Sequence, residues 1–121
     1  MITGSIGIWF FVFGGLTTML SLQFLFPNWY SRSFNKIEAG DDPALFYARQ
    51  AGLAIAVQGV LMIWAGFDPA LRLPTAVLAG TGKAVFVVTV LLYLRKFPGL
   101  LISAVVDSLA VVVLTLFLLG L

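Results

Sequence analysis

This sequence contains neither cysteine nor histidine. Without cysteine there is no disulfide, no thiolate nucleophile and no redox-active thiol pair. Without histidine the chain lacks the commonest metal and haem ligand and the commonest general base near neutral pH. Catalysis would have to rely on carboxylates, and only Asp107 falls inside a long apolar segment. We therefore expect a protein that is not an enzyme and that binds neither a metal nor another cofactor.

Charged residues are also scarce: they make up 10% of the 121 residues, whereas hydrophobic residues make up 61%. A soluble domain usually carries about 25% charged residues, so a chain this apolar would expose too much hydrophobic surface in water. The apolar residues form four long stretches. Each stretch is long enough to form a transmembrane helix, which needs roughly 20 mainly apolar residues. The sequence predicts an all-α integral membrane protein, a four-helix bundle forming a single domain over residues 1–121, with spans at about 5–26, 44–66, 73–94 and 99–121.

The few basic residues are distributed unequally between the loops. The side that carries loops one and three and the start of span two has most of them, namely Arg32, Lys36, Arg49, Arg95 and Lys96. The opposite side has only Arg72. Because basic residues flank the cytoplasmic ends of membrane helices, both termini are expected outside, in the periplasm, and loops one and three in the cytoplasm. Basic residues this scattered form no phosphate-binding face, so nucleic acid is not an expected partner.

Two loops carry structural predictions of their own. Loop three is so short that spans three and four should form an antiparallel hairpin. In loop one, Tyr30, Phe34 and Ile37 follow helical spacing with polar residues between them, which is typical of a short amphipathic helix on the membrane surface. An irregular polar loop fits this segment equally well. Asp42 followed by Pro43 is typical of an N-cap and the first helical residue, and so marks the start of span two.

Small residues recur every seven positions in the first two spans. They are Gly7, Gly14 and Ser21 in span one, and Gly52, Gly59 and Gly66 in span two. Small residues let helices approach closely in lipid, where packing drives association. We interpret the two rows as helix-packing seams of one bundle. The alternative is that one seam forms a contact with another protein.

Arg49, Lys83 and Asp107 are charged residues inside otherwise apolar spans. A charge at the centre of a membrane helix costs about 2.5–3.5 kcal/mol on the insertion scale, so such residues usually have a function or a partner. At about 1.5 Å rise per residue, Lys83 and Asp107 lie deep in their spans and can meet across the hairpin. Arg49 lies nearer the cytoplasmic side, within reach of Asp107.

Three interpretations of this charge cluster remain open. Asp107 could pair with Lys83 or Arg49 in a structural bridge that fixes the register of the helices. Alternatively, two cations and one anion leave a surplus positive charge, which a bound anion such as a lipid headgroup would neutralise. A proton or ion pathway is the third interpretation, and Gln58 and Thr89 would extend its polar track.

The run Ala48-Arg49-Gln50-Ala51-Gly52 at the start of span two, followed by Gly59, Lys83 and Asp107, resembles the DoxX-like group of small bacterial four-helix membrane proteins. The resemblance covers most of the chain but only a few positions. It implies a four-helix bundle in the bacterial cytoplasmic membrane and no established chemistry.

Two functional hypotheses follow. The first is a non-enzymatic accessory or assembly subunit of a larger membrane complex, with lipid bound along its seams. Short loops and glycine-lined faces favour this hypothesis, and its expected partners are membrane lipid and either a larger complex or further copies of the chain. The second is a small proton- or ligand-coupled transporter or carrier that uses Arg49, Lys83 and Asp107.

Overall fold

The structure, a computed structural model, describes residues 2–37 and 41–121. Over these ranges the chain is helical and contains no strand. The elements, in order, are α1 (Ile2–Thr18), α2 (Ser21–Leu25), α3 (Pro27–Tyr30), the π-helical turn η1 (Ser31–Asn35), α4 (Asp42–Phe67), the 3₁₀ turn η2 (Pro69–Leu71), α5 (Arg72–Leu92), the 3₁₀ turn η3 (Pro98–Leu100) and α6 (Leu101–Leu118). The predicted all-α four-helix bundle is confirmed.

The four long helical segments have the length and apolar composition needed to cross a membrane. They are Ile2–Leu25, Asp42–Phe67, Pro69–Leu92 and Pro98–Leu118. Large hydrophobic side chains on their outer faces are exposed, among them Ile8, Val60, Val85 and Ile102. An apolar exterior of this kind is the surface that a lipid bilayer accommodates.

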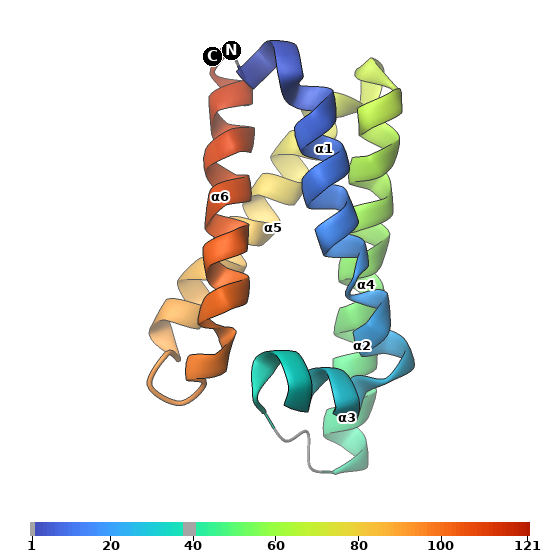
Figure 1. Cartoon of the computed structure of the whole chain (residues 1–121), viewed down its shortest axis with the longest axis vertical. Coiled ribbons are helices and arrows are strands. Elements are labelled where there is room, and N and C mark those ends of the chain that lie inside the picture. Colours follow the sequence, from blue (N-terminus) through green and yellow to red (C-terminus); the bar gives the residue numbers. More distant parts are fainter. Residues whose placement is uncertain (1, 38–40) are drawn as a thin grey trace.

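The bundle consists of two helix pairs (Figure 1). Helix α1 packs along α4, and α5 packs along α6. The predicted antiparallel hairpin of spans three and four is therefore confirmed. The N- and C-terminal ends of the chain lie side by side at one end of the bundle, and α3 crosses at the other end.

The first span, predicted at about 5–26, is found at Ile2–Leu25, and it contains a break. Helix α1 ends at Thr18, two turn residues follow, and α2 begins at Ser21. The hydroxyl of Thr17 donates to the carbonyl of Phe13 at 2.6 Å, and that of Thr18 donates to the carbonyl of Gly14 at 2.7 Å. Such bonds to the preceding turn bend helices, and two consecutive ones precede the break.

Helix α4 begins one residue earlier than its sequence indicates. Asp41, and not Asp42, is the N-cap, and its carboxylate accepts a hydrogen bond from the amide of Ala44 at 2.9 Å. Asp42 occupies the first turn, where a negative charge also favours the helix. The extended backbone of Asp41 suits the cap position, which lies outside the helical region.

The segment of loop one that carries Tyr30 and Phe34 is helical. It forms α3 and η1, and Lys36, the C-cap residue that follows η1, is in the left-handed conformation with φ of 58°. The rings of Tyr30 and Phe34 stack with their centroids 4.9 Å apart. Tyr30 is buried whereas Phe34 is exposed, so the side of this turn that carries Tyr30 faces the bundle.

The glycine rows of the first two spans meet within the chain. A Cβ atom built on Gly59 would lie 2.5 Å from the backbone nitrogen of Thr18, and one built on Gly14 would lie 2.9 Å from that of Ile63. Only glycine permits this approach of the two backbones. The seams therefore join α1 and α2 to α4. Gly52 and Gly66 have similarly close neighbours across the interface, a Cβ atom on Gly7 would lie 3.4 Å from the carbonyl oxygen of Gly66, and Ser21 opens α2.

The main cluster of buried hydrophobic side chains lies toward the end of the bundle that carries the chain termini. Its buried residues are Ile6, Phe10, Phe13, Met62, Ala65, Ala76, Ala79, Ala110, Val113 and Leu114. In α6 they all belong to the half that lies next to the C-terminus, in α1 none lies beyond Phe13, and none comes from α2, α3 or η1. The half of the bundle toward loops one and three is therefore packed differently, and it contains the candidate site.

Candidate functional site

Each of the four long segments contributes one polar side chain directly below the core. Thr17 follows Phe13 by one turn in α1, and Lys83 follows Ala79 by one turn in α5. In the helices that run the opposite way, Gln58 precedes Met62 by one turn in α4 and Asp107 precedes Ala110 by one turn in α6. Residues three or four apart share one helix face. We call these four residues, Thr17, Gln58, Lys83 and Asp107, the polar layer.

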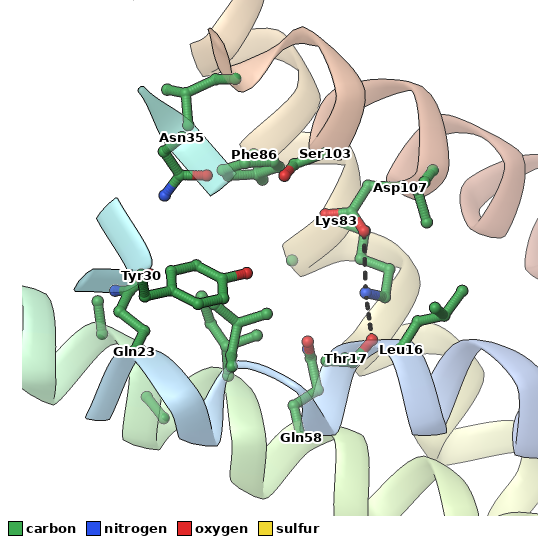
Figure 2. Close-up of a pocket in the computed structure, with 17 residues that line it drawn as sticks. Leu16, Thr17, Gln23, Tyr30, Asn35, Gln58, Lys83, Phe86, Ser103 and Asp107 are labelled. Carbon is green, nitrogen blue, oxygen red and sulfur yellow. Dashed lines mark hydrogen bonds and ion pairs between the residues drawn. The ribbon is translucent and has the colours of Figure 1, made fainter. Parts of the chain in front are cut away.

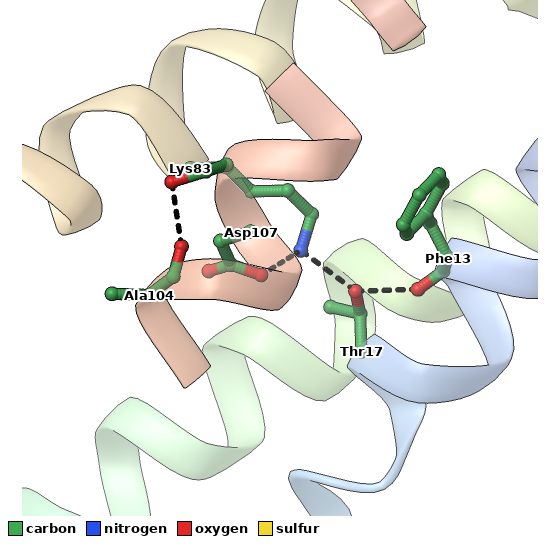
Figure 3. A network of polar contacts seen from close by, with 6 residues as sticks. Phe13, Thr17, Lys83, Ala104 and Asp107 are labelled. Atoms are coloured by element: carbon green, nitrogen blue, oxygen red, sulfur yellow. Dashed lines mark hydrogen bonds and ion pairs between the residues drawn. The ribbon is translucent and has the colours of Figure 1, made fainter. Parts of the chain in front are cut away.

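Three members of the polar layer form a continuous chain of hydrogen bonds (Figure 3). The ammonium of Lys83 donates to the hydroxyl of Thr17 at 2.8 Å and to Oδ1 of Asp107 at 3.2 Å. The Thr17 hydroxyl in turn donates to the carbonyl of Phe13. The contact between Lys83 and Asp107 is an ion pair that joins α5 to α6, while the contact with Thr17 joins α5 to α1.

The two charges of the ion pair are not equally accessible. The side chain of Lys83 is 5% exposed and that of Asp107 is 22% exposed. Across the described residues, no buried polar side-chain atom lacks a hydrogen-bond partner. A buried charge must be paired to be tolerated, and Lys83 meets this requirement with two acceptors. Asp107 keeps part of its carboxylate accessible.

A cavity of about 600 Å³ extends from the polar layer toward loops one and three. Its walls are mainly apolar, with Leu16, Leu20, Ile55, Phe86, Leu100 and Val106 among the lining residues. Its polar groups are Thr17, Gln23, Tyr30, Asn35, Gln58, Lys83, Ser103 and Asp107. A volume of roughly 300–1,000 Å³, apolar walls and a few convergent polar groups are typical of a small-molecule site.

Figure 2 shows how the polar groups converge on this space. The hydroxyl of Tyr30 points from α3 toward the ion pair, and the side chain of Gln58 rises from α4 into the same space. Gln23 is held in place because its amide donates to the carbonyl of Ala48 at 2.7 Å, which ties α2 to α4. Polar groups from both helix pairs thus face one cavity.

The end of the cavity near loop one is covered by α3 and η1. Tyr30 is 7% exposed, and Asn35 also lines the cavity. A Cβ atom on Gly99 would collide with the carbonyl oxygen of Asn35, so loops one and three are in direct backbone contact. Burial, and to a smaller extent the negative charge of Asp107, raise the pKa of the Tyr30 phenol above 10.0. Tyr30 therefore stays protonated and can donate a hydrogen bond.

The structure unites two of the three charged residues that the sequence singled out. Lys83 and Asp107 form the ion pair, whereas Arg49 is exposed on α4 and does not line the cavity. Of the two residues named as an extended polar track, Gln58 lines the cavity, and Thr89 is exposed and bonds to the carbonyl of Val85.

Sequence reasoning missed Thr17 and Tyr30. Thr17 stands beside Thr18 in an apolar span, and no periodic signal distinguishes the threonine that faces the bundle. Tyr30 falls in a loop, where its ring suggested contact with the membrane surface. Its helical spacing with Phe34 was the available signal, but that spacing does not say which side of the turn faces inward.

Comparison of this chain with protein-family models, with curated proteins and with solved structures finds no match. The resemblance to the DoxX-like group therefore stays a prediction.

Proposed function

We propose that this chain is a small membrane protein that binds an amphiphilic small molecule between its helices, as a carrier or transporter does. The observation that carries this proposal is the cavity of about 600 Å³ that ends at the Lys83–Asp107 ion pair. A bundle that needed only a structural bridge would pack apolar side chains around it, because interiors are normally filled to crystal-like density. Here the bridge borders open space.

The arrangement suits a ligand with one polar end and one apolar body. Apolar side chains from all four long segments form the walls, and the polar groups gather mainly at the polar layer and beneath α3. A ligand with an apolar body gains from burial against such walls. Its polar end gains from the hydrogen-bonding groups, which fix its orientation.

Native mass spectrometry of the protein extracted from its own membrane in mild detergent tests the proposal. We expect a small molecule bound to the chain and released when the chain unfolds. Ala54→Phe places a ring in the cavity wall and should reduce the bound fraction. Ala70→Phe is the matched control, because Ala70 is exposed in η2 outside the cavity. Equal occupancy in both variants, or no bound molecule in the unaltered protein, would contradict the proposal.

An accessory subunit of a larger membrane complex is the second proposal, and short loops still favour it. The glycine seams that also suggested it pack α1 and α2 against α4 inside the chain, so they are not available to a partner. Lipid at these seams is disfavoured for the same reason. The same mass spectrum distinguishes the two proposals, because a subunit would appear in one assembly of constant stoichiometry with a larger protein.

We also propose that the chain lies in a bacterial cytoplasmic membrane with both termini outside. The excess of basic residues in loops one and three supports this orientation. The absence of cysteine allows a direct test with single cysteines. In whole cells, an impermeant thiol reagent should label Ala70→Cys in loop two and leave Ser33→Cys in loop one unlabelled. The reverse pattern would overturn the orientation.

A further inference from the structure

The net charge of the cavity decides which ligands it can accept. Lys83 and Asp107 are the only lysine, arginine, aspartate or glutamate residues among the described residues that line it, and their charges cancel. A surplus positive charge would require Arg49 as a second cation in the cluster, but Arg49 is exposed elsewhere on α4. The cavity therefore has no surplus charge for an ionic ligand to neutralise.

An ionic ligand would bring an uncompensated charge to this depth. Charges in the interior of a membrane protein are tolerated when they pair with one another. Lys83 already has two acceptors, the Thr17 hydroxyl and Oδ1 of Asp107. The ammonium has three N–H donors, so an anion could bind only at the remaining one, and it would also approach the accessible carboxylate of Asp107. A cation would be drawn to that carboxylate but would lie near the ammonium of Lys83.

The remaining hydrogen-bonding groups match an uncharged head that both donates and accepts. Asp107 presents a partly accessible carboxylate, which only accepts. The hydroxyls of Tyr30 and Ser103 and the amide of Gln58 line the same cavity, and within residues 2–37 and 41–121 these three side chains form no hydrogen bond. A ligand hydroxyl can donate to the carboxylate and accept from Tyr30 or Ser103 at the same time.

Resting on the function proposed above, we infer that the ligand is an uncharged amphiphile with a hydroxyl-bearing head, bound with that head at Asp107 and its hydrocarbon chain along the apolar wall. Leu20, Ile55 and Phe86 belong to this wall. The cavity volume of about 600 Å³ suits a molecule of drug-like size. A single hydrocarbon chain is therefore the body that we expect.

Three probes that share one chain and differ only in the head test this inference: 1-decanol, decanoate and decylamine. At about pH 8 the carboxylic acid is ionised and the amine is protonated. Binding to the purified protein in detergent is followed by the bound mass and by the rise in unfolding temperature. We expect 1-decanol to bind about tenfold or more tightly than either ion. This difference in affinity follows from the free-energy cost of an uncompensated charge inside a membrane span.

Two variants should change the preference in opposite directions. Asp107→Asn leaves Lys83 without its counter-charge, so the cavity becomes positive and decanoate should become the preferred probe. Lys83→Met leaves Asp107 alone, so the cavity becomes negative and decylamine should become preferred. Helicity measured by circular dichroism shows which variants are folded. If one variant does not fold, the other still tests the change of preference.

The outcomes separate this inference from the proposed function. If the unaltered protein binds decanoate or decylamine as tightly as 1-decanol, or if a folded charge variant keeps the original preference, the inference is overturned. The proposed function still stands in that case, provided that Ala54→Phe weakens all three probes and Ala70→Phe does not. If no probe binds and the membrane extract contains no bound molecule, both fail. A charged amphiphile in the membrane extract would overturn the inference alone.

Discussion

The hydroxyl of Thr17 and the ammonium of Lys83 lie 2.8 Å apart although 66 positions separate them in the chain. This contact joins the pair formed by α1 and α4 to the pair formed by α5 and α6 at the lower limit of the hydrophobic core. The same ammonium binds Asp107, so one buried side chain links three helices. Below this link the cavity lies between the two pairs.

Replacing Thr17 by valine should weaken the link between the two helix pairs. Valine has a similar shape but no acceptor for the ammonium of Lys83. A hydrogen bond to a charged group contributes about 1.5–3 kcal/mol, and we expect a loss in the free energy of unfolding of about that size. Unfolding by denaturant titration in detergent micelles measures it. Thr89→Val is the control, because Thr89 is exposed and bonds only within its own helix. Equal losses in the two variants would refute the proposed role of Thr17.

Lys83→Met should destabilise the bundle more strongly. Removing one partner of a buried ion pair leaves the other charge uncompensated and costs about 3–5 kcal/mol. The double variant Lys83→Met with Asp107→Leu should be more stable than Lys83→Met alone, because no charge then remains in the polar layer. The same unfolding titration on the single and double variants measures the coupling between the two side chains. A silent Lys83→Met, or purely additive effects, would show that the ion pair does not support the fold.

Gly59→Ala and Gly15→Ala should have opposite effects. A Cβ atom on Gly59 would lie 2.5 Å from backbone and side-chain atoms of Thr18, whereas one on Gly15 would meet nothing within 4 Å. Overpacking typically costs about 1–3 kcal/mol, so Gly59→Ala should lower the free energy of unfolding by this amount. Gly15→Ala should raise it by about 0.5–1 kcal/mol, because alanine favours the helix. If both substitutions stabilise the protein, α1 and α4 do not approach at Gly59 as described.

Alkaline pH should release the segment that covers the cavity. Burial and the charge of Asp107 raise the pKa of Tyr30 in the folded protein above the usual 10.0. For a raised pKa, the stabilisation is complete below the unfolded value and is lost as the pH rises through the folded value. The phenolate absorbance should therefore show a step with a midpoint above about 10 that is absent from Tyr30→Phe. Stability should fall over the same pH range in the unaltered protein only. A lack of difference between the two proteins would place Tyr30 outside the bundle.

Much of the architecture follows from sequence patterns that act locally. The lengths of the apolar stretches identify the four long segments. The shortness of loop three predicts that α5 and α6 are antiparallel neighbours. The spacing of Gly7 and Gly14 and of Gly52, Gly59 and Gly66 predicted close packing, and the structure finds those residues where α4 meets α1 and, at Gly52, α2. The positions of Lys83 and Asp107 along their spans also predicted that the two side chains can meet, and the structure contains this contact as an ion pair.

Local patterns did not predict the break after Thr18 or the position of Arg49. Two neighbouring threonines bond to the preceding turn where α1 ends, and the hydropathy of the span gives no sign of this break. Arg49 shares one helix face with Gly52 in an ideal helix, yet α2 occupies the space beside Gly52, where a Cβ atom would meet Leu20 and Gln23. Arg49 is left outside this contact and is exposed.

The sequence by itself determined the elements of this protein: four apolar helices, their antiparallel order and the charges that they carry. Those properties depend on residue type and on spacing along one chain. Only the tertiary structure decided that the main hydrophobic cluster lies toward one end of the bundle, that Thr17 and Gln58 join Lys83 and Asp107 in one layer, and that Tyr30 faces the cavity. These relations depend on how each helix is rotated about its axis against the other three, and packing sets that rotation.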